Sequence, residues 1–207
     1  MDKNYLEGIK RLFDREALAI SSIPVSDNYS MVTDLIYDRV HMKGGKIIAS
    51  GMGKAGHVAS HLATTFSSTG TPALFLHPSE AQHGDLGVIR ENDLLLVLSN
   101  SGKTREILEL VDLTHELYHH IPIVIITGNP DGPLAQQSQL VLYTGSPEEI
   151  CPLGLTPTTS ATTMAVIGDV LVVLIMKRIG FTPSDYARRH HGGYLGQKSR
   201  GTGDEDS

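Results

Sequence analysis

The fold of this chain is decided by residues 46–57, which read KIIASGMGKAGH. Ile47–Ser50 is an apolar run that is too short for a helix, so it predicts a buried strand. Glycines at positions 51, 53 and 56 follow this strand directly and lead into a helical stretch. A strand that ends in such a turn and enters a helix is typical of a parallel sheet with helical crossovers. Ligands of such sheets bind at the carboxyl ends of the strands.

Short apolar runs alternate with helical stretches from Lys46 onward. The expected strands are Ile47–Ser50, Ala73–His77, Asp93–Ser99, Ile121–Thr127 and Leu140–Tyr143. The expected helices among and after them are His57–Phe66, Thr104–His119, Pro133–Gln137 and Thr158–Arg178. This alternation predicts an α/β fold in which helices cover both faces of a parallel sheet.

Three regions are expected along the chain. Residues 1–45 predict two amphipathic helices, Tyr5–Ile20 and Asp27–Met42, that pack on the core or on a partner subunit. Residues 46–197 form the predicted α/β core. Residues 198–207 contain no core-forming side chains, so we expect a disordered acidic tail there.

Composition and charge exclude several classes of protein. Hydrophobic residues make up 40% and charged residues 19% of the 207 residues, as in ordinary globular proteins. The net charge of −6 has no basic stripe to offset it, which argues against nucleic-acid binding. The single cysteine, Cys151, excludes a disulfide framework and favours a reducing compartment. The N-terminus has no signal-peptide block, and the apolar segment Val170–Met176 is far shorter than the ~20 residues of a membrane span, so we expect a cytoplasmic protein.

The turn after the first strand predicts anion binding. Gly51, Gly53 and Gly56 let the main chain approach an anion, and the next helix points its N-terminus at that anion. The same glycines match the dinucleotide pattern G-x-G-x-x-G, but the acidic residue that such a site needs is displaced, at Glu80, into a loop. Lys54, inside the turn, suits a phosphate or a developing oxyanion, so phosphate binding is favoured over a nicotinamide or flavin site.

A second anion cradle follows the third strand, at residues 99–104, which read SNSGKT. We call residues 99–104 the serine loop. Hydroxyl groups and backbone amides there donate hydrogen bonds to phosphate oxygens without adding charge. The end of this loop resembles an ATP-binding P-loop, but Val97 stands where that loop needs glycine. The predicted phosphate-binding residues of the two loops are Ser50, Gly51, Gly53, Ser99, Asn100, Ser101 and Thr104.

Acid and base groups stand in several of the remaining loops. Glu106 lies one turn into the helix after the serine loop, Glu149 follows the last strand, His83 follows the second strand, and His190 lies near the C-terminus. Each residue alone is more often a helix cap or a surface charge, whereas their joint placement around one sheet edge predicts catalysis.

No metal is predicted. His57 and His61 are spaced to share one face of a helix, but the metalloprotease pattern H-E-x-x-H is absent and no carboxylate lies between them. Cys151 is expected to be an inert thiol rather than a nucleophile.

Six sequence blocks together resemble the sugar isomerase (SIS) domain family and, within it, the arabinose-5-phosphate isomerases. The blocks are SGMGKAGH at 50–57, TFSSTGTP at 65–72, HPSEAQHGDLG at 77–87, LSNSG at 98–102, CPLGLTP at 151–157 and HHGGYLG at 190–196. The resemblance implies a three-layer α-β-α sandwich with a five-stranded parallel sheet of flavodoxin-like winding, and a homotetramer. It also implies interconversion of D-ribulose 5-phosphate and D-arabinose 5-phosphate without a cofactor, the first step toward Kdo for lipopolysaccharide or capsule.

The resemblance further implies catalytic roles for four residues, Lys54, Glu106, Glu149 and His190, and a ring-opening role for His83. We expect Glu149, with a raised pKa, to move the proton between C1 and C2. His190 would carry the oxygen protons with the help of Glu106, and Lys54 would stabilise the enediolate. Glu106 and Glu149 could exchange roles.

The chain departs from the family pattern in three places. Longer relatives carry CBS modules after the SIS domain, and this chain ends near that point, so we expect no regulation through CBS ligands. Lys103 replaces the usual glutamate beside the serine loop. His191 replaces the usual proline, which leaves open whether His190 or His191 acts. The sequence also leaves open whether this histidine acts in the site of its own subunit or in that of a neighbour.

Several alternatives remain open at this point. An isomerase of another sugar phosphate would use the same groups, and a non-catalytic sugar-phosphate sensor would keep only the phosphate cradle. A downstream product such as CMP-Kdo is an expected feedback ligand.

Overall fold

A computed structural model describes residues 3–191 of the chain. Its strands are β1 (Ile47–Gly51), β2 (Ala73–Phe75), β3 (Leu94–Leu98), β4 (Ile123–Thr127) and β5 (Leu140–Tyr143). Its α-helices are α1 (Lys3–Ser21), α2 (Asn28–Ile36), α3 (Gly53–Ser68), α4 (Pro78–Ala81), α5 (Arg105–Leu117), α6 (Pro133–Gln136), α7 (Thr159–Arg178) and α8 (Pro183–Arg189). A π-helix, η1 (Tyr37–Met42), continues α2, and a 3-10 helix, η2 (Asp85–Val88), precedes β3. The predicted tail, residues 198–207, lies outside the described residues.

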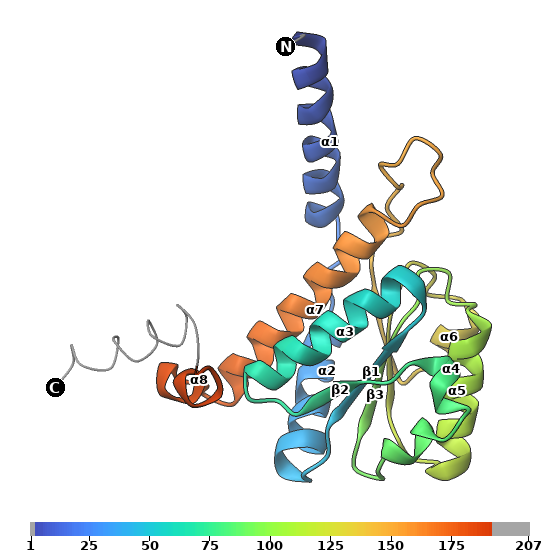
Figure 1. Ribbon diagram of the computed structural model, residues 1–207, viewed down its shortest axis with the longest axis vertical. Coiled ribbons are helices and arrows are strands. Elements are labelled where there is room, and N and C mark those ends of the chain that lie inside the picture. The colour runs from blue at the N-terminus through green and yellow to red at the C-terminus, as the bar shows by residue number, and fades with distance from the viewer. Residues whose placement is uncertain (1–2, 192–207) are drawn as a thin grey trace, which may run out of the picture.

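All five strands form one parallel sheet in the order β2-β1-β3-β4-β5 (Figure 1). This order is the flavodoxin-like, doubly wound arrangement, so the predicted α/β fold is confirmed. The strand order reverses between β1 and β3, and the loops that follow these two strands carry the predicted phosphate-binding residues.

Helices pack on both faces of the sheet because the strands are apolar on both sides. In β1, Ile47 and Ala49 join the core cluster formed with α2, α3 and α7, while Ile48 joins the cluster formed with α5 and α6. Side chains alternate along a strand, so each strand contributes to both clusters. Helices α3 and α7 approach closely at Gly168, where an added Cβ would lie 2.3 Å from the Leu62 side chain.

Several predicted boundaries differ from those observed. The second strand ends at Phe75 instead of His77, because Pro78 fixes the backbone for the first turn of α4. Helix α3 starts at Gly53, four residues before the predicted start, and the predicted helix Asp27–Met42 widens into η1 after Ile36. The short elements α4, η2 and α8 were not predicted, since segments of four to seven residues carry little periodicity.

Helix α7 is the one described helix that is long and apolar enough to cross a membrane, by length and composition alone. Half of its most apolar window is buried against the rest of the chain. This agrees with the predicted core helix at Thr158–Arg178. Its outer side leaves Val170 and Val173 exposed.

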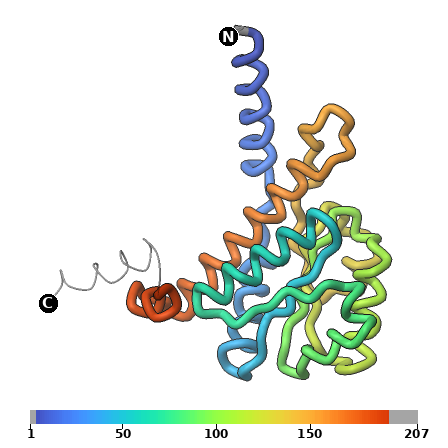
Figure 2. The backbone as a smooth tube through the Cα atoms, viewed as in Figure 1, coloured from blue at the N-terminus to red at the C-terminus, as the bar shows by residue number. Residues whose placement is uncertain are grey.

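Helix α1 projects from the body of the molecule, and only its C-terminal end lies against other elements (Figure 2). The adjoining helix α2, in contrast, packs with its buried Val32 and Ile36 against the core. Of the two predicted N-terminal helices, therefore, the second is a core element and the first is largely uncovered in a single chain.

Candidate active site

The turn between β1 and α3 is held open by tight glycine packing. Gly53 has φ +57°, in the left-handed region, and a Cβ on Gly56 would lie 2.5 Å from the Gly51 carbonyl oxygen. No side chain of the described residues caps the start of α3 at Met52. The first N–H groups of α3 therefore face the end of β1, and the exposed Lys54 stands among them.

Ser50 lies below this turn and is fully buried. Its hydroxyl donates to the Leu76 carbonyl oxygen at 2.7 Å, which ties the end of β1 to the connection after β2. The donor of Ser50 is thus already used within the protein. In this conformation Ser50 shapes the turn and does not donate to a phosphate.

The serine loop after β3 places its hydroxyls at the start of α5. The Ser99 and Thr104 hydroxyls lie 2.9 Å apart, and the Gly102 N–H donates to the Ser99 carbonyl with Gly102 at φ +63°. Ser101 Oγ accepts from the Lys103 N–H at 3.2 Å. Thr104 is the N-cap of α5, but its side chain does not accept from the helix. The N-terminus of α5 is therefore open beside these hydroxyls.

A third loop, at residues 128 and 129 after β4, supports the serine loop and was not predicted from the sequence. The Gly128 N–H donates to the Asn100 carbonyl at 3.1 Å, and a Cβ on Gly128 would meet the Asn100 side chain at 2.3 Å. Asn129 Nδ2 donates to the Ser101 carbonyl at 2.8 Å. The sequence does contain a signal for this loop, because Gly128 and Asn129 directly follow the predicted strand Ile121–Thr127.

Ser146 connects that third loop to the segment after β5. It is the only described non-glycine residue with a positive φ, at 50°. Its hydroxyl bonds to the Gly128 carbonyl oxygen and receives a hydrogen bond from the Tyr143 hydroxyl at 3.1 Å. The loop that carries Glu149 is thereby joined, through Gly128 and Asn100, to the serine loop.

Glu149 accepts three hydrogen bonds at a single oxygen. Its Oε2 accepts from the Thr158 N–H at 2.7 Å, the Thr158 hydroxyl at 2.8 Å and the Ser160 N–H at 3.3 Å. Burial raises the pKa of Glu149, but the hydrogen bonds from Ser160 and Thr158 outweigh it and hold the pKa below its usual value. The expectation of a raised pKa is therefore wrong for this conformation, because the carboxylate fills the N-terminus of α7.

Helix α1 holds the same loop from the other side. Arg15 Nη2 donates to the Glu149 carbonyl oxygen at 3.1 Å. The Thr159 hydroxyl donates to Glu16 Oε1 at 2.7 Å and accepts from the Ile150 N–H at 3.2 Å. Neither Arg15 nor Glu16 was predicted from the sequence, because charged side chains at these positions fit an ordinary amphipathic helix.

Glu106 and His83 lie on neighbouring elements of the α5 side. Glu106 is in the first turn of α5 and is partly exposed, close in sequence to Thr104. His83 is exposed just after α4, where Gly84 has φ +118°. Gln82 Nε2 donates to Glu109 at 2.7 Å and so fixes the end of α4 to α5. Glu106 therefore lies just after the serine loop, and His83 follows a short helix, α4, that is bound to α5.

His190 lies elsewhere. It ends α8, with its ring stacked on Tyr186 at 3.7 Å between centroids and its Nδ1 3.0 Å from the Tyr186 carbonyl oxygen. Just before α8, Phe181 packs on Gly70, in the turn that precedes β2. Helix α7 has 20 residues, so its ends are about 30 Å apart. Glu149 accepts hydrogen bonds at the first end of α7. Helix α8 follows the other end (Figure 1).

Within one chain, His190 therefore does not lie at the sheet edge that carries Glu106 and Glu149. Sequence order could not reveal this, because a long helix returns the chain to the opposite edge of the sheet. The exposed His191 lies beside His190, at the same distant end.

No group of three or more His, Cys, Asp or Glu side chains comes together as a metal site within residues 3–191. His57 and His61 are both exposed on α3. His61 Nε2 lies 3.9 Å from the Asp169 carboxylate on α7, and both side chains are more than half exposed.

Fold and site together define a class, namely a doubly wound α/β domain with two open helix N-termini and a carboxylate at the carboxyl edge of its sheet. Residues 42–174 match the profile of the SIS domain, and the chain belongs to the SIS domain family. The expected family is confirmed.

Relatives of known name agree with this assignment. The chain is 43% identical over 185 residues to arabinose 5-phosphate isomerase KdsD of Yersinia pestis, a match that covers 89% of this chain and 55% of the relative. The chain thus spans about half the length of the curated relatives it matches.

Two solved structures are similar over nearly their whole length. One, from Bacteroides fragilis, is a provisionally assigned phosphosugar isomerase involved in capsule formation. It shares 58% identity and a TM-score of 0.91, covering 92% of this chain and 99% of that one. The other is the E. coli CFT073 protein c3406 in complex with arabinose 5-phosphate, at 32% identity and a TM-score of 0.82, covering 92% and 100% of the two chains.

Proposed function

We propose that this chain is an aldose–ketose isomerase that interconverts D-ribulose 5-phosphate and D-arabinose 5-phosphate. The observation that carries the proposal is the arrangement of the loops after β1, β3 and β5, which all lie at the carboxyl edge of the sheet. They bring two helix N-termini without side-chain caps, at Met52 and Thr104, to the loop of the Glu149 carboxylate. The names of the KdsD relatives and the arabinose 5-phosphate complex of the E. coli protein support the choice of substrate.

The open N-termini suit the phosphate of the substrate. The N–H groups of α3 and α5 carry a partial positive charge, and the hydroxyls of Ser99, Ser101 and Thr104 surround the second of them. Binding energy from the phosphate would place the sugar carbons for reaction, since remote contacts position the reacting atoms.

Glu149 is proposed as the base that moves the carbon proton. Its three hydrogen bonds all go to Oε2, and among the described residues none goes to Oε1. Oε1 would remove a proton from C1 of the ketose while the C2 carbonyl oxygen gains a proton, which gives a cis-enediol. The same carboxyl group returns its proton to C2, and the C1 hydroxyl loses its proton to form the aldehyde.

Lys54 and Glu106 are proposed to act on the oxygens. The exposed Lys54 stands at the open N-terminus of α3, where its ammonium group would stabilise the enediolate. Glu106 would orient the sugar hydroxyls from α5. His83 would open the sugar ring.

His190 is proposed to reach this site from a neighbouring copy of the chain. Within one chain α7 separates it from Glu149, so the site would be complete only in an oligomer, for which we propose a tetramer. The proposal extends to a cytoplasmic location and to a product used for Kdo, with CMP-Kdo as a feedback ligand.

The proposal is tested by proton NMR of EDTA-treated protein with D-ribulose 5-phosphate in D₂O. We expect arabinose 5-phosphate to appear with deuterium at C2. Turnover of a different sugar phosphate in the same assay would replace the substrate but keep the reaction. Binding without turnover of any sugar phosphate would contradict catalysis and favour a sensor. Inhibition by CMP-Kdo is measured in the same tubes, and its absence would remove the feedback ligand.

A further inference from the structure

One peptide bond beside the proposed base is held at both ends by helix α1. This peptide bond joins Glu149 to Ile150. Its carbonyl oxygen accepts a hydrogen bond from Arg15 Nη2 at 3.1 Å. Its N–H donates to the Thr159 hydroxyl at 3.2 Å, and that hydroxyl donates to Glu16 Oε1 at 2.7 Å. Two consecutive residues of α1 therefore act on opposite ends of one peptide bond, and we call Arg15, Glu16 and Thr159 the α1 clamp.

The α1 clamp leaves the Glu149 side chain with little freedom. Thr158 and Ser160, at the start of α7, already hold its Oε2 by three hydrogen bonds. Thr159 stands between these two residues, and its hydroxyl holds the backbone instead. With the backbone fixed on one side and Oε2 on the other, the position of Oε1 is fixed as well. A base must lie within hydrogen-bond reach of the proton it removes, and a displacement of about 1 Å can lower a rate about 10²-fold.

Glu16 is a costly residue if it serves only to attach α1 to α7. Its Oε2 is buried and has no hydrogen-bond partner among the described residues. Burial of a carboxylate oxygen without a donor costs free energy, and an apolar side chain would pack there without that cost. The benefit lies at Oε1, because a Thr159 hydroxyl that donates to Glu16 keeps a lone pair for the Ile150 N–H. This favours a role for Glu16 in orientation over a role in stability alone.

Helix α1 lies outside the part of the chain that matches the family. The match to the SIS domain begins at residue 42, whereas α1 ends at Ser21. The C-terminal part of α1 nevertheless contacts the start of α7, where Glu16 meets Thr159 (Figure 1). The fold thus brings a helix from outside the family profile to the loop of the proposed base.

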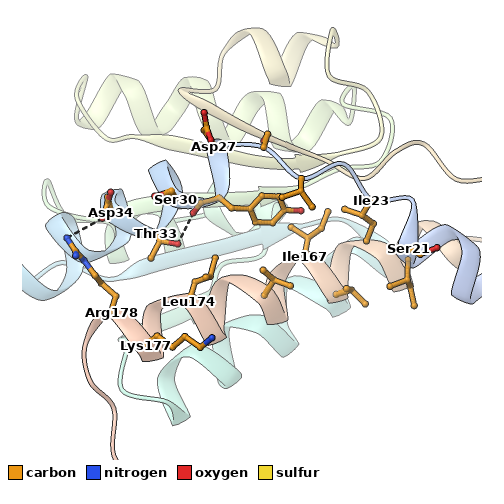
Figure 3. Close-up of a pocket in the computed structure, with 16 residues that line it drawn as sticks. Ser21, Ile23, Asp27, Ser30, Thr33, Asp34, Ile167, Leu174, Lys177 and Arg178 are labelled. Atoms are coloured by element: carbon orange, nitrogen blue, oxygen red, sulfur yellow. Dashed lines mark hydrogen bonds and ion pairs between the residues drawn. The ribbon is translucent and has the colours of Figure 1, made fainter.

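The α1 clamp is separate from the groove at the end of α1. This groove lies between α2 and α7, has a volume of about 930 Å³ and starts at Ser21 (Figure 3). Neither Arg15 nor Glu16 lines it, and no residue of the segment 144–160 does. A change in the α1 clamp therefore acts on the loop of Glu149 and leaves the walls of the groove unaltered.

We propose that Arg15 and Glu16 are positioning residues for Glu149. Arg15 holds the carbonyl end of the peptide bond after Glu149, and Glu16 holds its N–H end through Thr159. Neither residue acts on the substrate directly, and both act through the position of Oε1. The inference rests on the proposed function, since it takes Glu149 as the base of an aldose–ketose isomerase.

The first test removes the donor to the carbonyl end. Arg15→Met keeps the length of the side chain without its hydrogen bond, and kcat for D-ribulose 5-phosphate should fall about 10-fold to 10²-fold. KM should stay nearly the same, because the predicted phosphate loops follow β1 and β3. Arg15→Lys should recover most of kcat, since only Nη2 of Arg15 makes the bond. The control is Arg11→Met, at an exposed arginine one turn earlier on α1, which should leave both constants unchanged.

The second test acts on the N–H end. Glu16→Ala removes the acceptor of the Thr159 hydroxyl, and kcat should fall by a similar factor. Glu16→Gln keeps an acceptor oxygen and should recover most of the loss. Asp14→Asn, which removes a charge from an exposed side chain of the same helix, is the control and should have no effect. Because Glu16 acts through Thr159, Glu16→Ala combined with Thr159→Val should lower kcat no further than Thr159→Val alone.

Three kinetic outcomes would overturn the proposal. The first is an unchanged kcat in Arg15→Met and Glu16→Ala, with or without a higher KM. The second is an equal loss in a variant and in its control. The third is a fully additive loss when Glu16→Ala and Thr159→Val are combined.

The last measurement needs no turnover. Hydrogen–deuterium exchange of the free protein, read by mass spectrometry, reports on the backbone amides of the Glu149 loop. We expect faster exchange of this loop in Arg15→Met and Glu16→Ala but not in the two controls, with circular dichroism and sedimentation mass unchanged in all of them. Unchanged exchange in both variants would overturn the proposal, and so would a loss of turnover that accompanies a lower mass. If the chain turns over no sugar phosphate, the proposed function fails, and exchange alone decides whether the α1 clamp holds the loop.

Discussion

Helices α5 and α7 both begin at the carboxyl edge of the sheet, but their N-termini are satisfied differently. The start of α7 receives the Glu149 carboxylate, which accepts from Thr158 and Ser160. The start of α5 has no side-chain cap, because the hydroxyl of its N-cap Thr104 pairs with Ser99. Free N–H groups at a helix start attract an anion. The protein supplies that anion for α7 and leaves α5 for an anion from outside.

The largest effect is expected from Glu149→Gln, which keeps the shape of the α7 cap and removes its charge. Turnover should fall by about 10²–10⁴, the usual contribution of a positioned acid–base group. Phosphate binding at α5 should hardly change. NMR turnover and inhibition by inorganic phosphate measure the two effects separately. Unchanged turnover would show that Glu149 is a cap and nothing more.

Lys54→Met should cost turnover about 10²–10³, as is typical when one group that stabilises an oxyanion is removed. The control is Lys103→Met, since Lys103 is also an exposed lysine and lies within the serine loop. We expect this control to raise KM and to change kcat little. Equal losses in the two variants would mean that general positive charge, and no specific contact of Lys54, supports the reaction.

His190→Gln should be inactive alone and should recover activity when mixed with Lys54→Met. Mixed oligomers would hold some sites with an intact Lys54 from one chain and an intact His190 from another. The measurement is turnover after the two variants are unfolded and refolded together, compared with each variant refolded alone. No recovery would place His190 outside the shared site, or assign its role to His191.

The cap of α7 should make stability depend on pH. The folded pKa of Glu149 lies below its usual value, so its stabilising effect is complete above about pH 5 and is lost as the pH falls through the folded pKa. The unaltered chain should therefore melt above Glu149→Gln at pH 7, by about 0.3–1 kcal/mol in free energy of unfolding. The difference should disappear as the pH falls through the lowered folded pKa of Glu149. A difference in free energy of unfolding that does not change with pH would show that the charge of Glu149 does not stabilise the start of α7.

The smallest effect concerns Cys151, in the same loop as Glu149. Hydrogen bonds from backbone N–H groups, that of Thr156 at 3.3 Å foremost, outweigh burial, and with those of Leu155 and Leu153 they lower the pKa of the thiol to about 7. Alkylation by iodoacetamide should thus be half-maximal near pH 7, against ~8.5 for a free cysteine. Cys151→Ser, which lacks the thiol, is the control for alkylation elsewhere in the chain. A midpoint near 8.5 would mean that the loop after Glu149 is open in solution.

The parts of the site that sequence predicts are those that follow strands directly. Gly53, Ser99 and Thr104 could be assigned because a parallel sheet brings its strand ends to one edge, whatever the rest of the chain does. Asn129 and Ser146 follow strands too, but polar side chains in loops are too common to be singled out. Glu149 could be predicted from the sequence as a site residue, but its lowered pKa could not. The hydrogen bonds that lower this pKa come from residues nine and eleven positions further along the chain.

The sequence by itself determined the α/β class, the order of strands and crossovers along the chain, and the two phosphate-type loops. These features follow from local patterns, since periodicity, glycine and hydroxyl residues act within a few positions. Only the tertiary structure decided that α1 stands away from the body while its base holds the Glu149 loop. It also decided that α7, whose 20 residues span about 30 Å, separates the Glu149 loop from α8 and His190.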